Sequence, residues 1–252
     1  MIHNERFIEG YTIHATDGEL GKVDAFLFDD EKWVVRYLVV DTRKWLFGRK
    51  VLISPISIQD IHHEEEHISV DLTKEQVKDS PDIDTEQPVS REQEAKVNMF
   101  FDWGSYWGEP GIWGSGVYPA ELAQQEAMEM AEEEGPESHV RKTSEVIGYE
   151  VADRDSEAAG QVDNFLVDDE TWKIRYVLIR FTDGEEERIV PVEAERITGI
   201  SWPDKKVHAS IEKSALSNAP TYNPENPLDD DFKRKVHDAF AGTGTMSQQD
   251  KK

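Results

Sequence analysis

The chain has 252 residues, 37% of them hydrophobic, which is enough for two compact domains that each bury a modest core. A formal net charge of −25 repels phosphate backbones and argues against nucleic-acid binding, and the lack of cysteine excludes disulfides and thiolate chemistry. No run approaches the ~20 apolar residues of a membrane span, and the N-terminus lacks the features of a signal peptide. We therefore expect a cytoplasmic protein without an integral membrane segment.

Short antiparallel strands are expected in the first part of the chain. From Trp33 to Val40, aromatic and β-branched side chains alternate with period two, which predicts a strand with its aromatic face in a core. Turn residues at 16–18 and 29–31 precede it, and further strands are expected at 51–54 and 68–72. Pro55 marks a strand end. Closure of these strands into a small barrel would remove exposed strand edges.

A short helix is expected over 91–101, after the strands. Ser90 and Gln93 fit a capping box at its start. Val97 and Phe101 lie four residues apart, so they share one helix face, and we expect that face to dock on the strands.

A glycine-rich, aromatic segment follows this helix, and its glycines argue against a regular element. Its candidate partner-binding residues are Trp103, Tyr106, Trp107, Trp113 and Tyr118. Two interpretations stay open: the rings lie over a domain face and fix how the domains meet, or they form an adhesive surface for a partner. Residues 120–134 predict an exposed acidic helix.

The second half of the chain repeats the first half. Asp24, Trp33 and Tyr37 have counterparts 139 residues later, and a second helix is expected over 230–240, capped by Asp229. Aligning Pro55 with Pro191 makes the 41–50 segment three residues longer than its counterpart. The expected divisions are a first domain with its helix at 1–102, the linker and acidic helix at 103–140, a second domain with its helix at 141–241, and a disordered tail at 242–252.

The repeated runs resemble PRC-barrel domains. The resemblance rests on Gly10-Tyr11, on Lys22 to Asp30, on Arg36 to Val40 and on Val51 to Pro55, together with their counterparts in the second half. It implies a mainly β protein with short helices, built from two small PRC-type β-barrels (SH3-like) in tandem, each followed by a short helix. This family includes the cytoplasmic domain of the photosynthetic reaction-centre H subunit and a domain of a ribosome maturation factor.

The sequence departs from the H subunit at the position implied for proton delivery. In that subunit a proton-delivering acid lies three residues after the motif aspartate. Here Asp29 and Asp168 are retained, but the two matching positions hold Lys32 and Thr171. The resemblance therefore does not imply a proton-delivery role.

Two further groups were weighed as chemical sites. His62, His63 and His67 are metal-compatible, but they lie between two expected strands, so we predict a solvated hairpin loop and no metal site. The acid pairs at 29–30 and 168–169 are expected to stay solvated in turns, which makes them poor acid–base catalysts. We predict no enzyme activity and no cofactor.

Arg36 and Arg175 lie in the middle of equivalent strands. A structural ion pair with Asp24 or Asp163 across the sheet is favoured over a charge exposed for a partner.

The sequence therefore predicts a non-catalytic, acidic bacterial protein that acts as an interaction or assembly module for a protein partner of unknown identity. One alternative is a soluble H-subunit-like protein that docks on a photosynthetic electron-transfer complex in the membrane. Another is a small-molecule or metal sensor. The two barrels are expected to pack as an internal pseudo-dimer, or the chain to form a homodimer.

Overall fold

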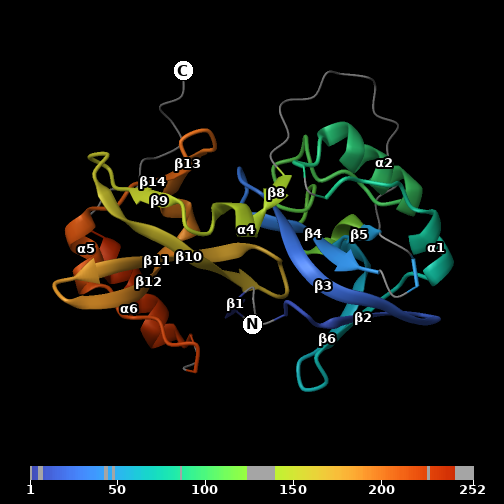
Figure 1. Cartoon of the computed structure of the whole chain (residues 1–252), viewed down its shortest axis with the longest axis horizontal. Helices are drawn as coiled ribbons and strands as arrows, with labels where there is room; N and C mark the ends of the chain where they lie inside the picture. Colours follow the sequence, from blue (N-terminus) through green and yellow to red (C-terminus); the bar gives the residue numbers. More distant parts are fainter. Residues whose placement is uncertain are drawn as a thin grey trace. The chain divides into compact units, whose positions relative to one another are not determined.

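The computed structural model describes residues 2–4, 8–42, 45–46, 49–85, 87–123, 140–225 and 228–241. The chain divides into two compact units, each built around a mainly antiparallel sheet (Figure 1). Unit 1 comprises residues 1, 6–145 and 169–173, and unit 2 comprises residues 2–5, 146–168 and 174–252.

The sheet of unit 1 runs in the order β5-β4-β3-β2-β7-β6, and β8 pairs with β3. Only the β2–β7 pair among these is parallel. The strands are β2 (Thr12–Ala15), β3 (Gly18–Asp29), β4 (Val34–Asp41), β5 (Lys50–Ile53), β6 (Ile58–His62), β7 (His67–Val70) and β8 (Val140–Lys142). All of β4 except Asp41 is buried, so both of its faces are covered rather than the aromatic face alone.

The sheet of unit 2 has the matching order β12-β11-β10-β9-β14-β13, and β1 pairs with β10. Its strands are β1 (Ile2–Asn4), β9 (Glu150–Ala152), β10 (Ala158–Asp168), β11 (Ile174–Asp183), β12 (Glu186–Glu193), β13 (Ile197–Ser201) and β14 (Lys206–Ala209). A tight turn with Gly184 at φ 66° joins β11 to β12, as the sequence predicted. The predicted class, mainly β with two tandem domains, is confirmed.

Closure of the strands into barrels is not observed. β5 and β6 lie at opposite ends of the strand order in unit 1, and no ladder joins them among the described residues. The 3-10 turn Pro55–Ser57 redirects the chain from β5 to the other end of the sheet, where β6 pairs with β7. The turn Ala194–Arg196 does the same between β12 and β13. Both sheets are therefore open.

The strand registers keep the 139-residue offset throughout. Leu38 pairs with Ile53 in unit 1, and Val177 pairs with Val192 in unit 2. The three-residue insertion expected at 41–50 is therefore wrong. The proline of unit 1 begins a 3-10 turn, whereas that of unit 2 lies inside the edge strand β12, so the two prolines are not equivalent. The β-bulges on β3 and β10 recur at equivalent positions as well.

Trp33 and Trp172 precede their strands instead of starting them. Their φ angles of 56° and 58° are left-handed, and Trp33 N donates to the carbonyl of Asp29 at 2.8 Å. Each tryptophan thus closes the turn that enters the next strand. Both side chains are buried, as expected for core residues.

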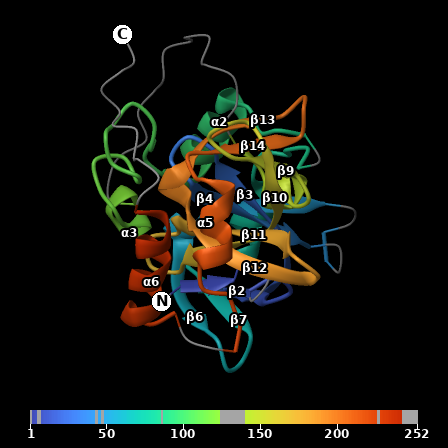
Figure 2. The same cartoon turned by 90° about the vertical axis from the view of Figure 1, so that its left-hand side faces the viewer.

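The two predicted helices form with the predicted bounds, as α2 (Arg91–Phe101) and α6 (Asp230–Phe240). Ser90 and Gln93 form the capping box, and Asp229 caps α6. Both helices dock on their own unit: α2 buries Val97, and α6 packs beside α5 and β12 (Figure 2). Four short helices were not predicted: α1 (Lys74–Asp79), α3 (Pro119–Leu122), α4 (Thr143–Val146) and α5 (Lys213–Asn218).

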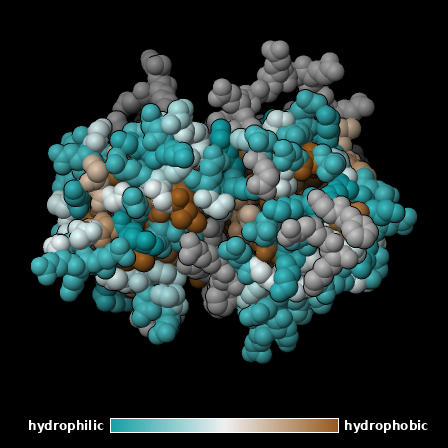
Figure 3. Space-filling model, viewed as in Figure 1, coloured by the Kyte–Doolittle hydropathy of each residue, from teal (hydrophilic) through white to brown (hydrophobic). Residues whose placement is uncertain are grey.

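Two predicted segments fall largely outside the described residues. Of the acidic helix expected at 120–134, the structure describes the residues up to 123, which include the end of α3. The expected disordered tail at 242–252 lies outside the described residues entirely. Among the helices that the structure describes, none is long and apolar enough to cross a membrane. The face drawn in Figure 3 is mostly hydrophilic, in keeping with the high charge.

Candidate functional site

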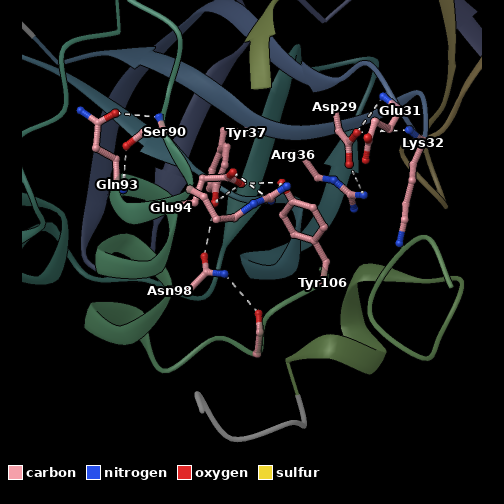
Figure 4. A network of polar contacts seen from close by, with 12 residues as sticks. Asp29, Glu31, Lys32, Arg36, Tyr37, Ser90, Gln93, Glu94, Asn98 and Tyr106 are labelled. Carbon is pink, nitrogen blue, oxygen red and sulfur yellow. Dashed lines mark hydrogen bonds and ion pairs between the residues drawn. The ribbon is translucent and has the colours of Figure 1, made fainter. Parts of the chain in front are cut away.

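The site starts at the turn between β3 and β4, around Asp29. This carboxylate is the last residue of β3 and is only 3% exposed. Its Oδ1 accepts hydrogen bonds from the backbone N–H groups of Glu31 and Lys32 at 3.0 and 3.1 Å, and its Oδ2 accepts from Arg36 Nη2 at 2.9 Å (Figure 4). Three donors thus compensate for its lost hydration. The prediction that the acids of this turn stay solvated is wrong for Asp29.

The structural ion pair predicted for Arg36 forms, but with a different acid. Its partner is Asp29 rather than Asp24, which lies farther along β3 and pairs with a lysine of β5 at 2.8 Å. The same correction holds in unit 2, where Asp168 is the partner of Arg175. The hairpin brings the end of β3 opposite the start of β4, which places these two residues together.

The aromatic linker, residues 103–118, covers the guanidinium of Arg36. Arg36 Cζ lies 3.6 Å from the centroid of the Tyr106 ring and 4.8 Å from that of the Trp113 ring. Its Nη1 donates a hydrogen bond to the carbonyl of Ile112. A desolvated cation–π contact contributes about 2 kcal/mol, and the Arg36 side chain is fully buried. We call this arrangement of Asp29 and Arg36 under the linker the Arg36 seat.

Lys32 fixes a second part of the linker. Its Nζ donates to the carbonyls of Glu109 and Gly111 at 2.9 and 2.7 Å. Burial lowers the pKa of Lys32, and the nearby charge of Arg36 lowers it further. Gly111 is required here because a Cβ atom would lie 2.5 Å from the carbonyl oxygen of Gly116. The lysine that stands at the position of the H subunit's acid therefore holds backbone carbonyls.

A cluster of side chains around Glu94 on α2 extends the seat (Figure 4). Tyr106 donates its hydroxyl proton to Glu94 Oε2 at 2.5 Å, and Arg91 Nη1 donates to Glu94 Oε1 at 3.1 Å. The Tyr37 hydroxyl lies 3.4 Å from Glu94 Oε2 and 3.3 Å from Asn98 Oδ1. The cluster thus connects the linker, the helix and β4.

The electrostatics of this cluster follow from its burial. Burial raises the pKa of Glu94 from 4.5 to about 7, although Arg91 and the bond from Tyr106 act in the opposite direction. Burial also raises the pKa values of Tyr37 and Tyr106 well above 10, with the charge of Glu94 adding to the effect. Both hydroxyls therefore stay protonated and serve as donors.

Trp113 is the most deeply buried ring of the linker. Its side chain is 1% exposed, and its Nε1 donates to the carbonyl of Thr171 at 2.8 Å, within the 169–173 segment of unit 1. A buried indole N–H needs such an acceptor. This bond fixes the end of the linker that covers Arg36.

The five candidate aromatic residues divide by exposure. Trp103, Tyr106 and Trp113 are buried in unit 1, which supports the interpretation that they lie over a domain face. Trp107 is half-buried beside Arg91, and Tyr118 is 47% exposed. A role in partner binding stays a prediction, and the exposed atoms of the last two rings are the ones that a partner could reach.

Sequence reasoning missed Glu94 and Asn98. Both lie on the same helix face as Val97, one turn before it and directly after it, and all three side chains are buried. Helical spacing from Val97 and Phe101 could have identified this face, because residues three and four apart are neighbours on a helix.

The candidate histidines lie in the hairpin where they were expected. The His62 and His67 rings stack with centroids 4.2 Å apart, and His14 stacks on His67 at 4.7 Å. His63 Nε2 lies 3.5 Å from a carboxylate oxygen of Asp169. Within the part of the chain that the structure describes, no group of three or more metal-ligating side chains is arranged to hold a metal ion.

Comparison with known proteins identifies both repeats. The family model described as "PRC-barrel domain" matches residues 8–77 and 139–213, which together make up more than half of the chain. No curated protein matches the sequence. The first match contains Asp29 and Arg36 but ends before Glu94 and the aromatic linker, so the cover of the Arg36 seat lies outside the matched domain.

Proposed function

This chain belongs to the PRC-barrel domain family, and we propose that it acts as a non-catalytic module for protein–protein interaction or assembly. The observation that carries the proposal is the Arg36 seat, where Arg36, Lys32 and Glu94 hold an irregular, glycine-rich aromatic segment. Ring stacking on a guanidinium and backbone carbonyls bound by cations are contacts that protein interfaces commonly use. In this chain a PRC domain makes these contacts with its own linker.

Exposed apolar side chains flank the linker in the sequence and supply candidate anchors for a partner. Met99 and Phe100 lie at the end of α2, and Val117 and Tyr118 lie just before α3. Between 41% and 56% of each residue is exposed. Large apolar side chains exposed on a highly charged protein favour an interaction surface.

The burial of the charged groups supports a non-catalytic role. Arg36 and Glu94 are fully buried and Tyr106 is 2% exposed, and each is bonded to other groups of the protein. A general acid or base must come within hydrogen-bonding distance of its substrate. Glu94, despite its raised pKa, is closed to such contact while the linker is in place.

No described contact favours either alternative function. Docking on a membrane electron-transfer complex has no feature of the described residues to support it. For a sensor, the structure offers a hollow of about 410 Å³ lined by Glu9, Lys22, Asp24 and Asp41. This charged lining differs from the mainly apolar walls that usually bind small molecules.

Affinity capture from the native cell tests the proposal. The full chain serves as bait, and the variant Phe100→Ser with Tyr118→Ser removes two exposed anchors without entering the core. The control, Glu64→Ser with Glu65→Ser, changes two exposed residues of the β6–β7 turn. We expect quantitative mass spectrometry to find a protein enriched by the wild type and the control, and reduced at least tenfold with the first variant. Equal recovery with all three baits, or no enriched protein, would sink the proposal.

A further inference from the structure

We propose that unit 2 carries a second peptide seat, centred on Arg175, which receives a tryptophan-bearing, glycine-rich segment of a partner protein. This inference rests on the proposed interaction function and specifies the chemistry of the partner. Its template is the Arg36 seat, whose occupant is visible in the same chain.

The ion pair at the centre of the two seats is the same. Arg175 and Asp168 follow Arg36 and Asp29 by 139 residues, and the Nη2–Oδ2 distance is 2.9 Å in both pairs. In unit 2 the Nε atom of Arg175 also donates to Oδ2, at 3.1 Å. Equivalent hairpins with equivalent bulges present both arginines. The sheet of unit 2 therefore builds the same centre.

The two seats differ in their cover. The side chains of Arg36 and Asp29 are 0% and 4% exposed, whereas those of Arg175 and Asp168 are 37% and 16% exposed. In unit 1, Arg36 Nη1 donates to the linker carbonyl of Ile112, and two rings stack on the guanidinium. Among the described residues, neither a hydrogen-bond acceptor for Arg175 Nη1 nor a ring over its guanidinium is present. The contacts that the linker makes in unit 1 are thus unmade in unit 2.

The repeat does not supply equivalent rings. In the linker, rings stand at positions 103, 106, 107 and 113, and the positions 139 residues later hold Gly242, Thr245, Met246 and Lys252. None of these side chains can stack on a guanidinium as tyrosine or tryptophan does. We therefore assign the occupant to a partner protein.

The neighbouring helix indicates which ring the seat prefers. Glu94, which accepts the Tyr106 hydroxyl in unit 1, has Lys233 as its counterpart on α6. The counterpart of Asn98 is His237, whose Nδ1 lies 2.9 Å from Glu193 Oε1. A tyrosine would lose the carboxylate that accepts its hydroxyl proton, whereas a tryptophan needs no such acceptor for stacking. The seat of unit 2 therefore favours tryptophan.

The probe is a synthetic peptide with the linker sequence 103–118, prepared as such and with Tyr106→Trp. Each peptide is titrated into the isotope-labelled full chain and followed by NMR. We expect saturable shifts at Arg175 Nε–H and at the Asp168 amide, with a Kd on the order of 1 mM or tighter and tighter binding of the tryptophan peptide. Absence of saturable shifts in unit 2, or shifts confined to unit 1, would overturn the proposal.

Three arginine variants show whether Arg175 is responsible. Arg175→Met should abolish the shifts, and Arg175→Lys should weaken binding at least fivefold, because an ammonium lacks the planar surface that stacks on rings. The matched control is Arg180→Met on the same strand, which removes an exposed ion pair with Asp163 and should leave binding unchanged. Unchanged binding in both Arg175 variants would contradict the assignment.

The peptide titration and the affinity capture fail independently. If the peptides do not bind but a partner depends on Phe100 and Tyr118, the second seat is refuted and the interaction function stands. If the peptides bind at Arg175 but the capture enriches no protein, the seat stands and the proposed function loses its support.

Discussion

Replacing Glu94 with glutamine should remove a pH dependence from the stability of unit 1. Burial raises the pKa of this carboxyl from 4.5 to about 7, so between these values the folded state holds a proton that the unfolded state releases. Stability is therefore greatest below pH 4.5 and is lost as the pH rises through 7. At about 1.4 kcal/mol for each pKa unit, the loss is on the order of 3 kcal/mol. Glutamine has nearly the same shape and does not ionise, so this loss should vanish.

Urea unfolding at several pH values between 4.5 and 8, followed by tryptophan fluorescence, measures this effect. Six of the seven tryptophans belong to unit 1, so the signal reports mainly on that unit. The quantity to compare is the free energy of unfolding of the wild type minus that of Glu94→Gln at each pH. The control is Glu92→Gln on the same helix, whose side chain is 78% exposed. If Glu94→Gln follows the same pH profile as the wild type, the reasoning is refuted.

Three further substitutions test the fold by urea unfolding. Arg36→Met should lower the free energy of unfolding by about 3–5 kcal/mol, since it leaves Asp29 buried without its cation; a loss below about 1 kcal/mol would contradict the seat. Gly21→Ala should lower it by about 3 kcal/mol or more, because a Cβ atom would lie 2.0 Å from the Asp41 carbonyl oxygen; wild-type stability would show that this approach is absent. Ser90→Ala should cost about 1 kcal/mol through loss of the cap of α2, and no loss would exclude that cap.

The repeat and the main elements could be predicted because their determinants are local. Alternation along β4 and β11, the turn at Gly184 and the capping residues Ser90 and Asp229 each act within a few residues. Such signals survive without knowledge of the tertiary structure. The offset error at Pro55 arose because a proline marks a strand end and an edge strand equally well.

The Arg36 seat could not be predicted, because burial of its charges depends on distant segments. Asp29 and Glu94 read as solvated acids until the linker, far away in the sequence, is laid over them. The partner of Arg36 was misassigned because the turn geometry, with Trp33 at positive φ, decides which acid faces it. Openness of the sheets likewise depends on the 3-10 turns, which the sequence pattern did not reveal.

Hydrogen exchange at the Trp113 indole tests most directly whether the linker occupies the Arg36 seat. Its Nε1–H is buried and bonded to the Thr171 carbonyl, whereas Trp107 is half-buried. The resonance can be assigned by its loss in Trp113→Phe. After transfer into D₂O, the Trp113 signal should persist long after the Trp107 signal has gone, and Arg36→Met should shorten its lifetime. Exchange of Trp113 as fast as that of Trp107 in the wild type would contradict the seat and the functions inferred from it.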